Sequence, residues 1–449
     1  MNSLALAVIV LAAGQGTRMK SARPKVLHEI AGRPMLAHVL TVAKALGAER
    51  TVVVTAPGAD ETASLVKHWG ADAAVQDRQL GTGHAVLAAE RALKGFDGNL
   101  LILFGDAPLL TAETLGRLTA RVGKGADIAA LGFRAADPAG YGRMIADGDR
   151  LIRIVEHKDA DAEQRRIDLC FAGMLAGPAK LVFDLLHEVR NDNAQGEFYL
   201  TDVIQIAQAR KLRAVIVEGP ENEMLGVNSR AQLADAEARF QERRRKALMD
   251  AGVGLIAPET VHLSADTEIE PDATVGPYVV FGPGVRVKRG AEIRAFCHIE
   301  GAEIGEGAIV GPFARLRPGA VLESSVHVGN FVEVKAAHLE AGAKVNHLSY
   351  IGDARVGTGT NIGAGTITCN YDGESKHRTD IGAGVFIGSD STLVAPLTIA
   401  DGAYVAAGST ITENVEKNAL VIARARQVAK SGMAERIRAR NKARKNRKA

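Results

Sequence analysis

The chain has 449 residues, enough for two or three domains that each bury their own core. It carries 55 basic and 52 acidic residues, and the resulting net charge of +3 excludes a general attraction to nucleic acid or to a membrane surface. Its cysteines, Cys170, Cys297 and Cys369, are scattered and odd in number, which argues against a disulfide framework and favours buried thiols in a reducing compartment. A catalytic cysteine is the alternative for any of them.

The first apolar run, "LALAVIVLAA", is predicted to be a buried strand and not a secretory signal. A signal carries positive charge before its apolar core, whereas the first basic residue here, Arg18, follows the run. The run is also shorter than the roughly 20 apolar residues that span a bilayer. We therefore expect a cytoplasmic protein without membrane insertion.

Up to about residue 228, short apolar runs such as "TVVVTAP" and "LLILFGD" alternate with helical stretches. This alternation predicts βαβ units and a parallel, doubly wound sheet. In such sheets the ligand lies beyond the carboxyl ends of the strands. The segments "LAAGQGTRM" (residues 11–19) and "FGDAP" (residues 104–108) are expected at that edge.

The loop "LAAGQGTRM" has the composition of a phosphate-binding turn. Gly14 and Gly16 let backbone amides approach phosphate oxygens, and Arg18 and Lys25 add positive charge. It is no dinucleotide fingerprint, because Met19 stands at the third glycine position, and the P-loop pattern is absent as well. Taken alone, an ordinary strand-to-helix turn remains the alternative.

Residues 229–250 are predicted to form a connecting helix. Leu233 and Phe240 fall on one helical face, and Asn228 or Ser229 can cap the start.

From residue 251 to about residue 422 the pattern changes to a period of six, as in "IGEGAI VGPFAR LRPGAV LESSVH". An aliphatic residue followed by a small one at every sixth position is the hexapeptide repeat of a β-helix. The aliphatic side chain fills a narrow prism, and stacked coils bury a core that no single repeat can make. The frame breaks at "NYDGESKHRTD" (residues 370–380), which is expected to be a protruding loop that carries function.

Residues 423–449 contain eleven Lys or Arg and a single acid, Glu435. We expect a solvated or disordered tail. A nucleic-acid arm is the alternative, but the segment lacks aromatic stacking partners. Only its first arginine, Arg424, is expected near an anionic ligand.

The motif L-x-x-G-x-G-T-R-M followed by Pro24-Lys25 resembles the sugar nucleotidyltransferases. The segments "GTGHA", "FGDAPLL", "YGRM", "VEHKDA" and "GVNSR" extend the similarity. With the hexapeptide repeats, the chain resembles the bacterial bifunctional N-acetylglucosamine-1-phosphate uridylyltransferases and glucosamine-1-phosphate acetyltransferases over nearly its full length. The resemblance implies a doubly wound, Rossmann-like α/β nucleotidyltransferase domain (1–228), a linker helix (229–250), a left-handed parallel β-helix acetyltransferase domain (251–422) and a basic tail (423–449).

For the first half, the resemblance implies that a sugar phosphate attacks the α-phosphorus of UTP and releases pyrophosphate. Arg18 and Lys25 are then catalytic, and Asp106 and Asn228 hold Mg²⁺, although Asp106 alone is also compatible with a strand-end turn. Gln76, Gly81 and Thr82 are the implied uracil site, and Gly142 and Glu156 the implied sugar site. The full set of implied nucleotide- and sugar-binding residues is Leu11, Ala12, Ala13, Gly14, Lys25, Gln76, Gly81, Thr82, Phe104, Gly105, Asp106, Gly142, Glu156 and Asn228.

The chain departs from this family at one sugar-binding position. Members carry an asparagine two residues before the glycine of an N-x-G strand, and here "CFAG" places Phe171 there. The expected sugar contact of that asparagine is therefore missing.

For the second half, the resemblance implies acetyl transfer from acetyl-CoA to glucosamine 1-phosphate. His347 in "VNHLSYIGD" is the implied base. The implied acceptor-sugar residues are Arg317, Lys335, Tyr350 and Asn361, and the implied acetyl-CoA residues are Ala364, Asn370, Tyr371, Ser389, Ala407 and Arg424.

Three readings of the whole chain follow. In the first, both halves are enzymes, N-acetylglucosamine 1-phosphate passes from one to the other, and the chain forms homotrimers with acetyl sites between neighbouring coils. In the second, the β-helix only assembles a single-activity nucleotidyltransferase. In the third, the chain is a regulatory subunit, which predicts a damaged glycine loop, yet Arg18, Lys25 and Asp106 are all present.

Overall fold

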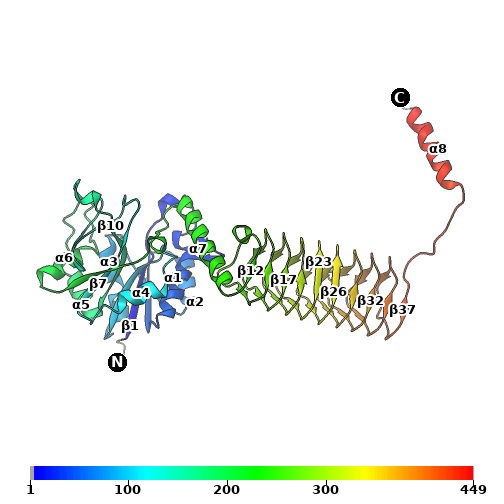
Figure 1. Ribbon diagram of the computed structural model, residues 1–449, viewed down its shortest axis with the longest axis horizontal. Helices are drawn as coiled ribbons and strands as arrows, with labels where there is room; N and C mark the ends of the chain where they lie inside the picture. The colour runs from blue at the N-terminus through cyan, green and yellow to red at the C-terminus, as the bar shows by residue number, and fades with distance from the viewer. Residues whose placement is uncertain (1–4, 448–449) are drawn as a thin grey trace. The chain divides into compact units, whose positions relative to one another are not determined.

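The computed structural model describes residues 5–447 (Figure 1). It divides into two compact units, each described below by itself. The first unit extends to Ala247 and includes Leu263–Ala265, and the second comprises Leu248–His262 and the chain from Asp266 onward.

The first unit is built on a nine-stranded sheet with the order β5-β4-β1-β6-β10-β7-β11-β9-β8. The strands are β1 (Leu6–Leu11), β4 (Arg50–Thr55), β5 (Asp72–Val75), β6 (Asn99–Phe104), β7 (Ile128–Arg134), β8 (Arg143–Asp147), β9 (Arg150–Val155), β10 (Leu169–Pro178) and β11 (Ala214–Glu218). The helices are α1 (Met35–Ala45), α2 (Asp60–His68), α3 (Thr82–Ala88), α4 (Ala112–Thr119), α5 (Ala179–Leu186), α6 (Asp202–Ala209) and α7 (Arg230–Asp250). A small hairpin pairs β2 (Glu29–Ile30) with β3 (Arg33–Pro34). Short 3-10 turns are η1 (Thr17–Met19), η2 (Lys25–Leu27), η3 (Glu90–Leu93), η4 (Gln164–Arg166) and η5 (Glu221–Glu223).

The central strands are buried on both faces, because they consist of uninterrupted apolar runs. In β1, Ile9 faces one core with α3, α5 and α6, whereas Val8 and Val10 face a second core with α1 and α4. Alternate residues of a strand point to opposite sides, so one strand serves both cores. The predicted doubly wound α/β fold is confirmed.

The sheet is mixed and not purely parallel. Strands β5, β4, β1 and β6 are parallel neighbours, as predicted, but β10 lies antiparallel to both β6 and β7. The hairpin β8–β9 adds a further antiparallel edge. The alternation of apolar runs and helices cannot distinguish strand direction, since a buried strand is apolar on both faces in either direction.

The carboxyl ends of β1 and β6 lie side by side, with Leu11 paired to Phe104. The glycine loop follows β1, and "FGDAP" follows β6, so both segments meet at one edge. Gly105 allows this close approach, because a Cβ atom there would lie 3.3 Å from the Leu11 carbonyl oxygen. This edge holds the candidate site described below.

Helix α7 begins at Arg230, directly after Asn228 and Ser229, the two residues predicted to cap it. The Ser229 hydroxyl accepts a hydrogen bond from the Gln232 amide at 3.2 Å, which caps the helix start. Ala236 and Phe240 of this helix pack in a small core with Ile30 and Val227.

The second unit is a stack of three-sided coils, in which each side is a parallel sheet of very short strands (Figure 1). We name the sides D, E and F. Face D contains β12 (Gly254–Leu255), β14 (Thr274–Val275), β17 (Glu292–Ile293), β20 (Ile309–Val310), β23 (His327–Asn330), β26 (Lys344–His347), β29 (Asn361–Ile362), β32 (Phe386–Ile387), β35 (Tyr404–Val405) and β37 (Leu420–Val421). Face E contains β15 (Val280–Phe281), β18 (His298–Ile299), β21 (Arg315–Leu316), β24 (Glu333–Lys335), β27 (Tyr350–Gly352), β30 (Ile367–Cys369), β33 (Thr392–Val394) and β36 (Thr410–Ile411). Face F contains β13 (Glu268–Ile269), β16 (Arg286–Val287), β19 (Ala302–Ile304), β22 (Ala320–Leu322), β25 (His338–Leu339), β28 (Ala354–Val356), β31 (Thr379–Ile381) and β34 (Leu397–Ile399).

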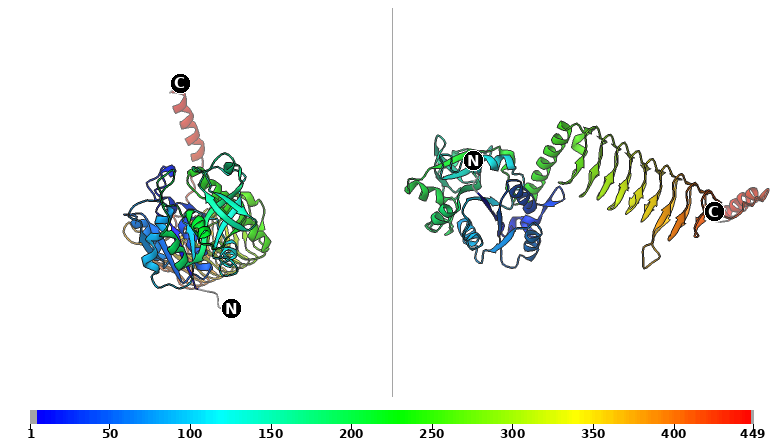
Figure 2. Two further views of the ribbon diagram at one scale, coloured as in Figure 1. Left: turned by 90° about the vertical axis from the view of Figure 1, so that its left-hand side faces the viewer. Right: turned by 90° about the horizontal axis from the view of Figure 1, so that it is seen from below.

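This stack is the parallel β-helix that the hexapeptide period predicts. In most strands one aliphatic side chain points inward and is fully buried, as at Ile299, Val334 and Ile387. Each such side chain contributes about 1.5–3 kcal/mol of hydrophobic free energy. The loop 370–380 leaves the stack between β30 and β31, where the frame breaks (Figure 2).

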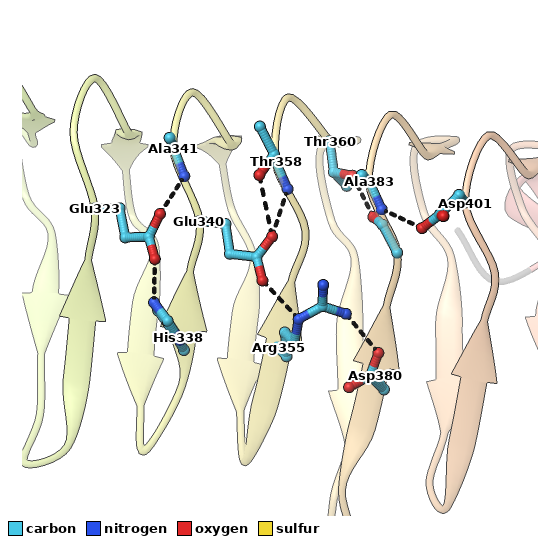
Figure 3. A network of polar contacts seen from close by, with 11 residues as sticks. Glu323, His338, Glu340, Ala341, Arg355, Thr358, Thr360, Asp380, Ala383 and Asp401 are labelled. Atoms are coloured by element: carbon cyan, nitrogen blue, oxygen red, sulfur yellow. Dashed lines mark hydrogen bonds and ion pairs between the residues drawn. The ribbon is translucent and has the colours of Figure 1, made fainter.

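Face F presents a ladder of charged groups (Figure 3). The Glu340 carboxylate accepts hydrogen bonds from the Thr358 amide at 3.0 Å and from the Arg355 guanidinium at 2.7 Å. One coil earlier, Glu323 accepts from the Ala341 amide at 2.9 Å and contacts His338 at 2.8 Å. In both cases a carboxylate on one coil accepts a hydrogen bond from a backbone amide on the next coil. The outer surface of face F is therefore charged.

The basic tail contains a helix, α8 (Met433–Asn446), whose residues are all exposed. A solvated tail was expected, but the helix was not. Alanine, arginine and lysine are strong helix formers, and no branched or glycine residue interrupts the run after Ile437.

Two of the three cysteines are buried, and Cys369 is half-buried. Burial raises the pKa of Cys297 to about 11 and also raises the pKa of Cys170. Both thiols therefore stay protonated, which agrees with the expectation of inert buried thiols and argues against the catalytic alternative for these two.

Candidate functional sites

A pocket of about 510 Å³ opens at the carboxyl edge of the mixed sheet. Except for Gly105, all nucleotide- and sugar-binding residues inferred above line this pocket. They are Leu11, Ala12, Ala13, Gly14, Lys25, Gln76, Gly81, Thr82, Phe104, Asp106, Gly142, Glu156 and Asn228. Gly105 lies directly behind the wall, where its amide donates to the Leu11 carbonyl at 2.9 Å.

The glycine loop carries free backbone donors. The amides of Gly14, Gln15, Gly16 and Thr17 have no hydrogen-bond partner among the residues the structure describes. Gly16 is left-handed, with φ of 61°. Arg18 follows on the turn η1, where it is exposed and stands outside the pocket wall. Consecutive unpaired amides beside a cation form an anion-binding loop.

Lys25, Asp106 and Asn228 meet at the mouth of this loop. The Lys25 ammonium group donates to the Asp106 carboxylate in a close ion pair and to Asn228 Oδ1 at 2.9 Å. Little of the Lys25 side chain is exposed (11%), and the Asp106 side chain is similarly covered (15%). The two oxygen ligands inferred for a metal ion thus converge on one cationic group.

Gln76, Gly81 and Thr82, the residues inferred for uracil, form a second wall of the pocket. The Gln76 amide nitrogen donates to the Gly81 carbonyl at 3.2 Å and contacts His84 Nδ1 at 3.1 Å. Gly81 has φ of 112°, and a Cβ atom there would lie 2.6 Å from the Phe198 carbonyl oxygen. Only glycine fits this position.

The sugar-side end of the pocket is acidic. The Glu156 carboxylate accepts a hydrogen bond from the Thr201 hydroxyl at 3.1 Å. Burial raises the pKa of Glu156, with further contributions from Asp159 and Asp202. Burial also raises the pKa of Asp202 to about 6. A neutral hydroxyl-bearing ligand that donates to Glu156 suits this end better than an anion does.

In the β-helix, four of the residues inferred for the acetyltransferase gather where the face E strands end. Asn370 donates to the Asp353 carboxylate, and Lys335 pairs with the same carboxylate at 3.1 Å. The Asn370 amide also lies 3.4 Å from the Tyr350 hydroxyl. Arg317, two coils before Tyr350, pairs with Glu333 at 2.8 Å. We call Arg317, Lys335, Tyr350 and Asn370 the phosphate-side group.

Hydrogen bonds keep Asp353 ionised within this group. Burial opposes its ionisation, but the bonds from Asn370 and Lys335 outweigh that effect and hold the pKa of Asp353 below its usual value. The neighbouring Lys335 ammonium lowers the pKa of Lys376, a residue of the loop 370–380. The loop therefore brings a third cation beside Arg317 and Lys335.

His347 lies at the opposite end of the face E strands, on the corner between faces D and E. Its Nδ1 contacts Asn330 Oδ1 at 2.9 Å. The amide oxygen can only accept, so Nδ1 carries a hydrogen, and Nε2 has no partner within the described residues. Asn361 lies on face D, one coil further along, in the strand β29, where it is the backbone register partner of Lys344 in β26.

Most of the inferred acetyl-CoA residues lie on successive coils along the same D/E corner as His347. The Gly365 amide, next to Ala364, donates to the His347 carbonyl at 3.3 Å. The Asp390 amide, next to Ser389, donates to the Ala364 carbonyl at 2.7 Å, and the Arg424 guanidinium donates to the Ala407 carbonyl at 2.6 Å. His347, Ala364, Ser389, Ala407 and Arg424 thus form one column. Tyr371 stands apart in the loop, where it is more than half exposed.

Known proteins match both halves of the chain. Residues 8–168 match the MobA-like NTP transferase domain family. The protein named bifunctional protein GlmU from Jannaschia sp. is 54% identical over 99% of this chain and 98% of its own length. The one from Xanthobacter autotrophicus is 54% identical over 98% of each chain, and the one from Paramagnetospirillum magneticum is 51% identical over the whole of both.

The chain belongs to the GlmU family. It is a bifunctional enzyme of UDP-N-acetylglucosamine synthesis, with an acetyltransferase and a uridylyltransferase activity. Because the GlmU relatives match from end to end, the readings as a single-activity enzyme and as a regulatory subunit are set aside. No helix among residues 5–447 is long and apolar enough to cross a membrane.

Three residues that touch the candidate sites carry no local sequence signal. Gln79 donates to the Ala13 carbonyl at 2.6 Å and so ties the glycine loop to the pocket wall. Thr201 and Asn330 contact the inferred site residues Glu156 and His347 only through the fold. Asp353 and Lys376 lie within segments that the sequence singles out, but their common partner Lys335 is far away in sequence, so no motif could reveal the contact.

Phe171, the residue expected in place of the family's asparagine, is a structural part of the pocket. Its backbone amide pairs with the Gly142 carbonyl at 2.8 Å, and its side chain is buried in the core while it lines the pocket. Phe171 therefore adds an apolar surface to the wall of the pocket.

Proposed function

We propose that the pocket of the first unit carries out uridylyl transfer from UTP to N-acetylglucosamine 1-phosphate. The free amides of Gly14–Thr17 are suited to bind the triphosphate, and Arg18 and Lys25 to neutralise the charge that develops as pyrophosphate leaves. The sugar phosphate is already an anion, so its attack on the α-phosphorus needs no general base. Positioning and charge neutralisation therefore supply the catalysis.

A magnesium site in this pocket is part of the proposal. Asp106 and Asn228 fit it, since their oxygens already converge on the Lys25 cation. Among residues 5–447 no group of three His, Cys, Asp or Glu side chains could hold a metal ion. Substrate phosphates and water are proposed to complete the shell around Asp106 and Asn228. When bound, Mg²⁺ would neutralise phosphate charge.

The roles in substrate recognition are proposals of the same kind. Gln76, Gly81 and Thr82 bind the uracil ring, which matches their wall of mixed amide and backbone groups. Gly142 and Glu156 bind sugar hydroxyls. The hydrogen bond that Glu156 already accepts from the Thr201 hydroxyl supports this role.

We propose that the β-helix transfers the acetyl group of acetyl-CoA to the amine of glucosamine 1-phosphate. His347 Nε2 takes a proton from the amine as the nitrogen attacks the thioester carbonyl, and the proton passes to the departing coenzyme A thiolate. Asn330 orients the imidazole. Arg317, Lys335 and Lys376 bind the sugar phosphate, and the column Ala364, Ser389, Ala407 and Arg424 holds acetyl-CoA.

The assignment of acetyl transfer to the β-helix rests on the spacing between His347 and the cationic residues Arg317, Lys335 and Lys376. Tyr350 lies three positions after His347, and the strand β27 then leads to Asp353 at the phosphate side. At about 3.3 Å per residue, face E spans about 10 Å, the scale of a hexosamine 1-phosphate lying across it. The amine then reaches His347 while the phosphate reaches the cations.

The two activities are tested together by mixing enzyme with glucosamine 1-phosphate, acetyl-CoA, UTP and Mg²⁺. Free thiol and pyrophosphate are followed separately. Thiol is expected to appear first, and pyrophosphate only after acetylated sugar accumulates. Pyrophosphate from pre-acetylated sugar without any thiol from glucosamine 1-phosphate would contradict the bifunctional assignment.

We also propose a division of labour along the chain and a cytoplasmic location. Residues 1–228 form the uridylyltransferase, 229–250 the linker and 251–422 the acetyltransferase, and the tail 423–449 contributes Arg424 alone. UTP and acetyl-CoA are cytoplasmic substrates, which supports that location. No role for nucleic acid is proposed.

A homotrimer is proposed from the unequal surfaces of the β-helix. Tyr278, Phe296, Phe313 and Phe331 stack ring on ring along the D/E corner, with centroids 4.8–5.2 Å apart, and Leu348 continues the column. Each of these five side chains is about half exposed or more. An apolar column of this length, on the corner opposite the charged face F, is typical of a surface that another copy covers.

Replacing Phe313 by glutamate should therefore separate the chains. A charge in the middle of an apolar interface opposes association, and mass by sedimentation should fall from three chains to one. Acetyl transfer should fall with it, while uridylyl transfer stays. The matched control is Val321→Glu on face F, which should leave the mass unchanged; an unchanged mass for Phe313→Glu as well would contradict the interface.

A further inference from the structure

We propose that the Lys25 ammonium group occupies the metal position of the nucleotide-free enzyme, so that a divalent cation enters only when this group leaves. This inference rests on the proposed function of Asp106 and Asn228 as metal ligands. It goes beyond it by giving Lys25 a second task before the reaction starts.

The first argument is that one position is shared. Asp106 follows β6 and Asn228 precedes α7, yet their oxygens meet at the same nitrogen, Lys25 Nζ. Carboxylate and amide oxygens are also the ligands that Mg²⁺ prefers. Two cations that bind the same oxygens repel each other strongly, so the ammonium group and the metal ion exclude one another.

The second argument is that the pair is shielded from water. The exposed fractions of the Lys25 and Asp106 side chains are 11% and 15%. Without a cation, Asp106 would be a mostly covered carboxylate without a charge partner, which is unfavourable. Lys25 therefore keeps the ligand pair in place while no metal is bound.

The third argument concerns where Lys25 goes. Its stem is held by the glycine loop, because a Cβ atom on Gly16 would lie 2.6 Å from Lys25 Cβ. Only the outer part of the side chain is free to swing. It then stays beside the unpaired amides of Gly14–Thr17, where a triphosphate supplies new oxygen partners for the ammonium group.

Metal and nucleotide binding are consequently coupled through one side chain. The metal alone must displace Lys25 without compensation, whereas the metal with a nucleotide gives Lys25 a phosphate to bind. Each ligand therefore raises the affinity of the other by the same factor.

The test measures Mn²⁺ binding to the full-length protein without nucleotide, by electron paramagnetic resonance of free Mn²⁺. Lys25→Met should bind Mn²⁺ about tenfold more tightly than the unsubstituted protein, a usual size for a coupling between sites. Lys20→Met is the matched control, because it removes one exposed charge from the same loop and should leave the affinity unchanged. Asp106→Asn should lose the site.

A second titration adds a non-hydrolysable UTP analogue. The analogue should raise the Mn²⁺ affinity of the unsubstituted protein much more than that of Lys25→Met. Equal Mn²⁺ affinities of Lys25→Met and the unsubstituted protein, with loss in Asp106→Asn, would overturn this inference alone. If Asp106→Asn binds Mn²⁺ as the unsubstituted protein does, the metal assignment of the proposed function fails, and this inference fails with it. An unchanged thermal unfolding curve of the full-length protein shows that each variant is folded.

Discussion

Replacing His347 by alanine is expected to slow acetyl transfer about 10²–10⁴-fold and to leave uridylyl transfer unchanged. The amine of the acceptor sugar must lose a proton as it attacks the thioester. In the second unit, His347 has a ring nitrogen left free, because Asn330 holds the other. Thiol release with glucosamine 1-phosphate and pyrophosphate release with N-acetylglucosamine 1-phosphate measure the two activities in the same preparation.

His338→Ala is the matched control for this variant. His338 also lies on the β-helix, but on face F, where it pairs with Glu323. Its loss should affect neither activity. Equal loss of both activities in His347→Ala would indicate collapse of the protein, and retained thiol release would contradict the assignment of the base.

We propose that Asn330 is a positioning residue for this reaction. Its amide oxygen contacts the His347 imidazole, so its removal should matter less than the removal of His347 itself. What it decides is which ring nitrogen carries the hydrogen.

Replacing Arg18 by alanine is expected to have the reverse effect, with uridylyl transfer about 10²–10³-fold slower and acetyl transfer unchanged. Arg18 stands at the end of a loop with four unpaired amides, outside the pocket wall and exposed. It has to approach the triphosphate as the loop binds it. Its charge is then used where the leaving pyrophosphate gains negative charge, so kcat should fall more than the affinity for UTP.

Lys20→Ala is the matched control, since Lys20 is exposed two residues further on and carries the same charge. A general loss of electrostatic attraction would lower both variants alike. Unimpaired uridylyl transfer in Arg18→Ala would refute the assigned role, and an equal loss in Lys20→Ala would reduce it to long-range attraction.

The two units differ in how much of them a reading of the sequence predicts. In the β-helix nearly every inward residue follows the six-residue period, because each coil repeats the same local geometry. In the α/β unit the parallel strands and the loop position were predictable, but the antiparallel insertion of β10 was not. Strand direction depends on long-range pairing, which leaves no periodic trace.

The motifs likewise indicate residue types without their partners. The sequence alone determined that a glycine loop with Arg18 and Lys25 follows the first strand and that a frame-breaking loop interrupts the coils. Only the tertiary structure decided that Lys25 meets both Asp106 and Asn228, and that Lys376 from the loop stands beside Lys335. The reason is physical. Local spacing sets backbone geometry and periodic burial, whereas the Lys25 charge meets Asn228 only through the packing of segments 203 positions apart.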